Sequence, residues 1–387
     1  MPSFFESFAS AIRNHTKGAL ERLPSGWKRR DSGIPSAFQK FEHGFDAGSG
    51  RLSAKPARAP HPGHKKEPRI IENFGSNPGA LIMRLYTPPH PRRRPALVVV
   101  LHGCKQNAKS YDKGSGWSKL ADRGGFILLY PEQQARNNPG TCFNWFEPKD
   151  IKRDSGEACS IRQMIGKAVS LHGADPARIF ICGLSAGGAM AGVMLACYPE
   201  IFSAGAIIAG LPYGAASSAN EAMEAMYNGR AKSAKAWGDL VRAASRHEGR
   251  WPNIAVWQGS LDTTVKPVNA GEIVKQWTNV HGLGGTSPMC EQAGVITVRS
   301  WPDSKGTPRI VEYIVAGMGH GAPIAGYGGA SDGSPGPFFL STGLWSSLRI
   351  AQDWGLFDKN GMPVKSSRFA LPSFNSRMNH FSRSPGV

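Results

Sequence analysis

The chain of 387 residues is 40% hydrophobic, which suffices for a sizeable core. It contains no apolar run of about eighteen residues, so no transmembrane helix is expected. Its formal net charge is +18, of which residues 1–69 carry +7 and residues 359–387 carry +5. This distribution predicts basic tails on a globular body and argues against a nucleic-acid-binding core.

The two ends of the chain differ in composition from its middle. Residues 1–68 are rich in Pro, Gly and charge, which predicts a poorly ordered leader. Glu6 and the lack of an apolar central region argue against a secretory signal peptide at the start. We therefore expect one folded domain over residues 69–358 and a disordered basic tail over residues 359–387.

Apolar runs separated by helix-like segments mark the predicted folded domain. An edge strand is predicted at Ala80–Tyr86, before a proline-rich turn. The further strands expected in chain order are Ala96–Leu101, Gly125–Tyr130, Arg178–Cys182, Ala204–Ala209, Ile254–Gln258 and Ile310–Val315. Helices are expected at Trp117–Arg123 and Ser160–Leu171. This alternation predicts an α/β fold with a mostly parallel sheet and helices on both faces.

Residues 212–250 interrupt this alternation. The stretch is rich in alanine and polar side chains, which predicts a helical excursion between two strands. A lid over the functional edge of the sheet and a structural insert are both consistent with this composition.

The clearest motif of the chain reads GLSAG at residues 183–187. The apolar run Ile179–Cys182 precedes it, and an Ala- and Met-rich helix-forming run follows. Glycines on both sides of Ser185 let a strand and a helix approach closely, so this arrangement predicts a nucleophile elbow. A second G-x-S-x-G match at Gly329–Gly333 has glycine and proline flanks, which predict that Ser331 lies in a loop.

Two further residues follow late strands and complete a catalytic set with Ser185. Asp262 comes after the strand predicted at Ile254–Gln258, and His320 lies on a glycine-flanked loop after Ile310–Val315. The order Ser, Asp, His is that of the α/β-hydrolase triad. Histidine removes the serine proton, and the carboxylate fixes the imidazole tautomer. Other histidines lie mostly in the tails or on predicted helices, and Asp303 precedes a predicted strand instead of following one.

Acyl transfer also needs two backbone N–H groups that stabilise the developing oxyanion. Ala186, directly after the nucleophile, supplies one. The second is expected from the loop after Ala96–Leu101, which reads HGCKQ, and Cys104 is the candidate donor.

Six motifs in order resemble the polyhydroxybutyrate (PHB) depolymerase family of esterases, which is related to feruloyl and acetylxylan esterases. They are LHGCKQNA at 101–108, YPEQ at 130–133, CFNWF at 142–146, DSGEACSI at 154–161, GLSAGGAM at 183–190 and GMGHGAPI at 317–324. The resemblance covers about residues 78–355. It implies an α/β-hydrolase fold, hydrolysis of carboxylic esters without a cofactor or metal, and a location outside the cell or in its envelope. By matching motifs, Ser185, Asp262 and His320 become the triad.

The resemblance also implies a disulfide between Cys104 and Cys142 beside the oxyanion hole. Both cysteines follow the ends of strands expected to be neighbours, so a bond there would hold the Cys104 N–H in place. The alternative is a pair of reduced cysteines in a cytoplasmic enzyme, consistent with the missing signal peptide.

The aromatic stretch after Cys142 offers candidate substrate-binding residues. Asn144, Trp145 and Phe146 combine apolar area with an amide that bonds ester or hydroxyl groups. The alternative for Trp145 is a place in the core.

The expected substrate is a poly- or oligo-(3-hydroxybutyrate) or a related short-chain hydroxyalkanoate ester. A feruloyl or acetylxylan esterase on the same scaffold is the alternative enzyme. In a third interpretation of a different class, the basic tails bind nucleic acid or an anionic membrane and the hydrolase domain is only a scaffold. For the enzyme, such tails offer contact with an anionic membrane or a polymer surface.

Overall fold

A computed structural model describes residues 67–326 and 333–364 of the chain. Its strands are β1 (Arg69–Ile71), β2 (Ile82–Tyr86), β3 (Leu97–Leu101), β4 (Ile127–Glu132), β5 (Ile179–Leu184), β6 (Ala204–Ile208), β7 (Asn253–Gly259), β8 (Met289–Ala293), β9 (Ile296–Pro302), β10 (Pro308–Val315), β11 (Ala322–Ile324) and β12 (Phe339–Ser341). The first ten form one sheet in the order β1-β2-β4-β3-β5-β6-β7-β10-β9-β8. The six central strands, from β4 to β10 in this order, are parallel, and the two strands at each end pair antiparallel. The predicted mostly parallel sheet is confirmed.

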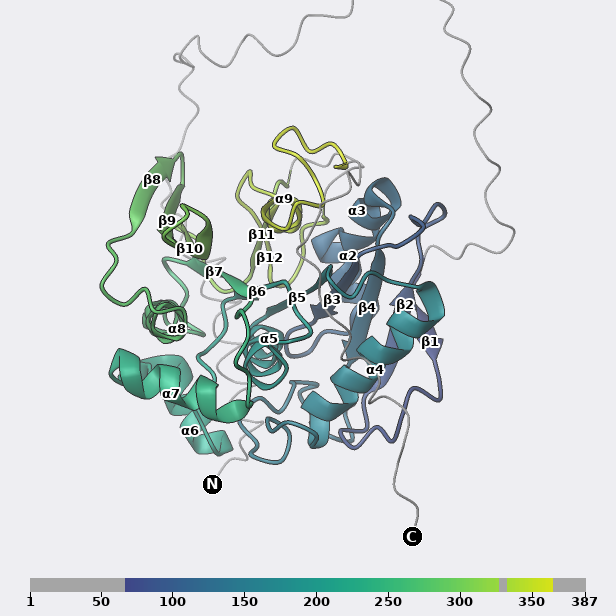
Figure 1. Cartoon of the computed structure of the whole chain (residues 1–387), viewed down its shortest axis with the longest axis horizontal. Helices are drawn as coiled ribbons and strands as arrows, with labels where there is room; N and C mark the ends of the chain where they lie inside the picture. Colours follow the sequence, from purple (N-terminus) through teal and green to yellow (C-terminus); the bar gives the residue numbers. More distant parts are fainter. Residues whose placement is uncertain (1–66, 327–332, 365–387) are drawn as a thin grey trace, which may run out of the picture.

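Helices cover both faces of this sheet (Figure 1). They are α2 (Ala108–Ser115), α3 (Trp117–Gly124), α4 (Gly156–His172), α5 (Ala186–Cys197), α6 (Ala219–Asn228), α7 (Ala234–Ala244), α8 (Val268–Val280) and α9 (Ser346–Asp353). Figure 1 shows α4 to α8 on one face and α2, α3 and α9 on the other. Strand β3 is buried on both faces: Leu97 and Val99 pack with the first group of helices, and Val98 and Val100 with the second. This two-sided burial explains its uninterrupted apolar sequence.

The ends of the sheet differ from the predicted arrangement. The segment expected to be an edge strand, Ala80–Tyr86, contains β2, which lies between β4 and the short edge strand β1. The antiparallel pair β8–β9 at the opposite end was not predicted, because all five residues of β8 are exposed and carry no apolar alternation. Asp303 precedes a strand, β10, as predicted, but it also directly follows β9, and it forms an ion pair with Arg309 of β10.

The stretch 212–250 is helical, as expected, and contains α6 and α7. Its Trp237 is fully buried and donates its indole N–H to Glu272 on α8. Helix α7 therefore packs on the face of the sheet that carries α5 and α8, and it widens that helical layer (Figure 1).

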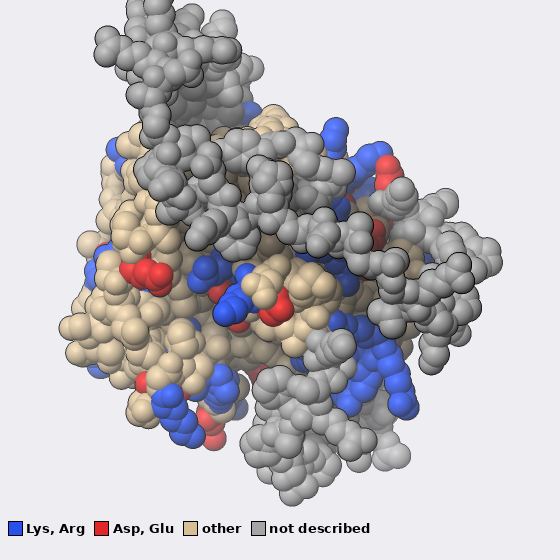
Figure 2. All heavy atoms as spheres, turned by 90° about the horizontal axis from the view of Figure 1, so that it is seen from above, with Lys and Arg blue, Asp and Glu red and all other residues tan. Residues whose placement is uncertain are grey.

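The expectations for the two tails concern residues that lie mainly outside the described ones. The leader up to residue 66, the second G-x-S-x-G match around Ser331 and the tail from residue 365 belong to this group. Residues 359–364 are described, and they pack back on the domain: the Val364 N–H donates to the Leu356 carbonyl at 3.1 Å, and Arg123 donates to the Gly361 carbonyl. On the face that Figure 2 shows, the described surface is mostly neutral, with Lys and Arg in groups among Asp and Glu.

Candidate active site

Ser185 lies at the turn between β5 and α5 and has a left-handed backbone conformation, with φ at 57°. A non-glycine residue rarely adopts this conformation, which marks a strained turn. A Cβ atom at Gly183 would lie 2.2 Å from the Gly187 carbonyl oxygen, and one at Gly187 would lie 2.4 Å from the Leu101 carbonyl oxygen. The glycines are therefore required by the close approach of strand and helix, as the motif predicts.

Asp262 and His320 come together because β7 and β10 are parallel neighbours whose carboxyl ends meet. The loops after the two strands are tied by the Leu261 N–H, which donates to the Met318 carbonyl at 2.9 Å. Across these loops, His320 Nδ1 lies 2.8 Å from Asp262 Oδ2. The structure thus joins the predicted acid and base by a hydrogen bond.

The Asp262 carboxylate is buried and surrounded by donors. Oδ1 accepts the N–H groups of Thr264 and Val265, each at 2.9 Å. Oδ2 accepts Gln258 Nε2 at 3.0 Å in addition to the imidazole. Because a carboxylate only accepts hydrogen bonds, the contact fits the tautomer of neutral His320 with its proton on Nδ1, which leaves a lone pair on Nε2.

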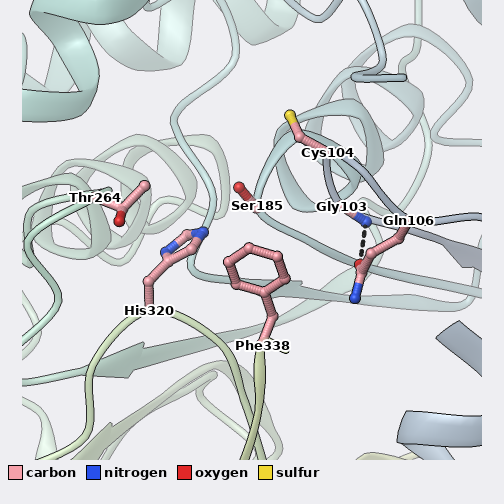
Figure 3. Close-up of a pocket in the computed structure, with 7 residues that line it drawn as sticks. All are labelled: Gly103, Cys104, Gln106, Ser185, Thr264, His320 and Phe338. Carbon is pink, nitrogen blue, oxygen red and sulfur yellow. Dashed lines mark hydrogen bonds between the residues drawn. The ribbon is translucent and has the colours of Figure 1, made fainter. Parts of the chain in front are cut away.

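A pocket at this edge of the sheet brings Ser185 and His320 together. It is lined by Gly103, Cys104, Gln106, Ser185, Thr264, His320 and Phe338. Figure 3 shows the imidazole beside the serine hydroxyl, with one ring nitrogen directed toward it. The seven lining residues lie outside the stretch 212–250. In this structure the helical insert therefore supplies no wall of the pocket.

The loop after β3 brings one candidate oxyanion donor, the Cys104 N–H, to the other side of Ser185. The Gly103 N–H already donates to Gln106 Oε1 at 2.8 Å (Figure 3) and is not free for an oxyanion. The next N–H group along the loop is that of Cys104. Cys104 is bonded to Cys142, which confirms the predicted disulfide. Ala186 begins α5, where N–H groups point out of the helix end and favour negative charge.

His102, which precedes this loop, has a structural role. It is 1% exposed, and its Nε2 lies 3.1 Å from the Gln133 backbone N–H. Because that group only donates, Nε2 accepts, and Nδ1–H donates to the Gly103 carbonyl at 2.8 Å. Burial lowers the pKa of His102, so the ring stays neutral and both nitrogens are occupied.

Comparison with known proteins decides the family. A family model described as Esterase PHB depolymerase matches residues 81–295, more than half of the chain. The chain belongs to this family. It is a carboxylic ester hydrolase with an α/β-hydrolase fold. The match includes Ser185 and Asp262, and it ends before His320.

Individual relatives of this PHB-depolymerase-family esterase differ in their named substrates. Poly(3-hydroxyalkanoate) depolymerase C of Paucimonas lemoignei is 43% identical over 288 residues, 74% of this chain and 69% of that protein. Feruloyl esterase B of Neurospora crassa is 33% identical over 263 residues, 65% of this chain and 87% of that protein. The solved acetyl xylan esterase from Aspergillus awamori is 26% identical, with a TM-score of 0.61 over 66% of this chain and 94% of that one.

The three residues predicted to bind substrate lie away from the pocket of the esterase. Trp145 and Phe146 are each 5% exposed and belong to the core beneath α4 and α5. The Asn144 side chain donates to Glu157 Oε1 and accepts from Asn138 Nδ2, both at 2.9 Å. Direct substrate contact by these three residues stays a prediction, and their geometry favours a role in supporting the Cys142 loop.

Sequence reasoning missed three pocket residues of the esterase. Gln106 and Thr264 lie within loops that were singled out, but only the contacts reveal their roles. Phe338 follows a proline-rich stretch with no catalytic pattern, and it has a φ of 66°. Its ring centroid lies 6.0 Å from that of His320, nearly at right angles to it.

Three of the four cysteines outside the disulfide are buried, and Cys290 is exposed. Cys159, Cys182 and Cys197 are buried and free, and burial raises the pKa of each thiol, to about 12 for Cys197. Within the described ranges, no group of three or more His, Cys, Asp or Glu side chains is arranged to hold a metal ion. The helices described there also include none that is long and apolar enough to cross a membrane.

Proposed function

We propose that this esterase hydrolyses poly- or oligo-(3-hydroxybutyrate), or related short-chain hydroxyalkanoate esters, through an acyl-enzyme on Ser185. The observation that carries the mechanism is the 2.8 Å contact between His320 Nδ1 and Asp262 Oδ2, in the pocket that also contains Ser185. The substrate class rests on the 43% identity to a poly(3-hydroxyalkanoate) depolymerase.

In the proposed reaction, Ser185 Oγ attacks the ester carbonyl carbon while His320 Nε2 takes the hydroxyl proton. The N–H groups of Cys104 and Ala186 stabilise the resulting oxyanion. The intermediate collapses, the ester C–O bond breaks, and His320 gives its proton to the leaving alcohol. Water then attacks the acyl-enzyme with the same proton transfers, which releases the acid and restores Ser185.

The first test replaces the nucleophile. Ser185→Ala is expected to lower kcat for p-nitrophenyl butyrate by at least about a thousandfold, because removal of a triad nucleophile costs several orders of magnitude. The purified variant should keep the wild-type melting temperature within a few degrees. A loss of less than about a hundredfold in a folded variant would contradict the proposed mechanism.

A second candidate substrate class has support of its own. The feruloyl esterase and the solved acetyl xylan esterase cover similar shares of this chain. A panel of 3-hydroxybutyrate oligomers, methyl ferulate and acetylated xylan separates the candidates by kcat/KM. We expect the oligomers to have the highest kcat/KM. A higher kcat/KM for methyl ferulate or acetylated xylan would instead identify that ester as the substrate class.

We also propose that the esterase acts outside the cytoplasm, in the medium or the cell envelope. The Cys104–Cys142 disulfide supports this location, because disulfides persist in oxidising compartments. Family membership favours an enzyme over a non-catalytic binding protein. Contact of the basic tails with an anionic membrane or a polymer surface concerns residues that lie mainly outside the described ones.

A further inference from the structure

Glu157 is a buried acid that the proposed reaction does not use. It lies in the first turn of α4 and is 1% exposed. Its carboxyl group is the meeting point of three donors: the Asn144 backbone N–H at 2.9 Å, the Asn144 side-chain amide at 2.9 Å and the Gln133 side-chain amide. Two separate loops thus converge on one carboxyl group.

From Glu157, one route of contacts leads to the oxyanion loop through Gln133. The side-chain amide of Gln133 donates to the Cys142 carbonyl at 3.1 Å as well as to Glu157. The backbone N–H of Gln133 donates to His102, whose other nitrogen holds the Gly103 carbonyl. The residue after Gly103 is Cys104, the candidate oxyanion donor.

A second route reaches the same residue through Asn144. Glu157 fixes both the backbone and the side chain of Asn144, two residues after Cys142. Asn144 in turn holds Asn138, which accepts the Gly140 N–H at 3.0 Å. Since Cys142 is bonded to Cys104, both routes end at the same N–H group.

The surroundings of Glu157 make the ionised form of its carboxyl group unfavourable. Desolvation, with a smaller effect from Asp150, raises the pKa of Glu157 to about 8. Asp150 accepts the Glu157 N–H at 3.1 Å, and no Lys or Arg in the described part of the chain forms an ion pair with Glu157. Buried acids without a cation are uncommon. Because three donors and no cation of the described residues meet this acid, its contacts fit a task of holding those donors in place.

We propose that Glu157 is a positioning residue of the esterase, which holds the oxyanion loop so that the Cys104 N–H faces the reacting carbonyl oxygen. This inference rests on the proposed function. It explains why the motifs around 102, 133, 142 and 157 occur together in one chain, because their residues form one hydrogen-bond network around Cys104.

The decisive variant is Glu157→Gln, which keeps the size of the side chain. Both oxygens of Glu157 can accept hydrogen bonds, even when one of them carries a proton, whereas the amide nitrogen of Gln only donates. Whichever way the amide turns, that nitrogen faces one or more of the three donors. The loop then shifts and the Cys104 N–H is displaced. We expect kcat for p-nitrophenyl butyrate to fall by at least about tenfold with KM within about threefold, because the oxyanion exists only after attack.

Glu272→Gln is the matched control, because it makes the same chemical change at another buried acid. Glu272 lies on α8, where it accepts the Trp237 indole N–H and forms an ion pair with Lys275. We expect this variant to lower the melting temperature but to keep kcat within about twofold. Equal losses of kcat in the two variants, or an effect of Glu157→Gln on KM alone, would overturn the positioning role.

Gln133→Met keeps the test decisive if Glu157→Gln fails to fold. It removes the side-chain amide that joins Glu157 to Cys142 but keeps the backbone N–H that reaches His102. We expect kcat to fall by at least about fivefold, and an unchanged kcat would contradict the positioning role. Failure of the proposed function shows separately, since Ser185→Ala would then retain activity whatever the outcome at residues 157 and 133.

Discussion

The two sides of the pocket are built in different ways. On the base side, Ser185 directly follows β5, and Asp262 and His320 lie in the loops after β7 and β10, so the ends of central strands set their positions. On the oxyanion side, Cys104 is placed by side chains from distant segments, among them Gln133, Asn144 and Glu157. Damage to the base side should therefore remove chemistry with little loss of stability, whereas damage to the oxyanion side should affect both.

The largest effect is expected on the base side, from Asp262→Asn. The new amide would place a donor against His320 Nδ1 or against the N–H groups of Thr264 and Val265, and the imidazole would lose its correct tautomer. We expect kcat to fall by about 10³–10⁴, by analogy with the same change in other triads, while the protein stays folded. Asp303→Asn is the control, since that acid pairs with Arg309 in the β9–β10 turn and should leave kcat unchanged.

A smaller loss of activity with a larger loss of stability is expected from the double change Cys104→Ser and Cys142→Ser. The bond closes a loop with a sequence separation of 38, and chain entropy assigns about 3–4 kcal/mol to a loop of this size. We expect the free energy of unfolding in urea to fall by this amount and kcat by about tenfold. Cys290→Ser, at an exposed free cysteine, is the control. An unchanged kcat would restrict the disulfide to stability.

The third expected effect concerns stability and not kcat, and it is a pH dependence that arises on the oxyanion side. The pKa of Glu157 is about 8 in the folded protein, against an ordinary value of 4.5. Its contribution to stability is thus fully present below pH 4.5 and is lost as the pH rises toward 8. We expect wild type to lose stability relative to Glu157→Gln over this range, with a slope of at most about 1.4 kcal/mol per pH unit. Parallel curves in urea titrations at pH 5 to 8.5 would contradict this account.

The same contrast explains what the sequence could predict. The elbow could be predicted because its strand, turn and helix are contiguous in sequence, and the steric requirement at Gly183 arises from Gly187 in the same motif. The places of Asp262 and His320 followed from strand ends, and the disulfide came from a resemblance between motifs.

The missed features depend on contacts between distant segments. Glu157 looks like an ordinary helical acid until Gln133 and Asn144 are seen around it. Phe338 has no local pattern at all, and β8 is too polar to be recognised as a strand. For Trp145, residue type alone leaves open a pocket wall and a place in the core; the structure buries the side chain, and substrate contact stays a prediction.

The small sheet after His320 connects two sides of the pocket mechanically. Strand β11 begins two residues after His320 and pairs in parallel with β12, which begins directly after Phe338. The Ala322 N–H also donates to the Phe338 carbonyl at 2.8 Å, so one short ladder fixes the base and the aromatic wall together. A change in either short strand is therefore expected to move the imidazole and the Phe338 ring together, because the same backbone ladder carries both sides of the pocket.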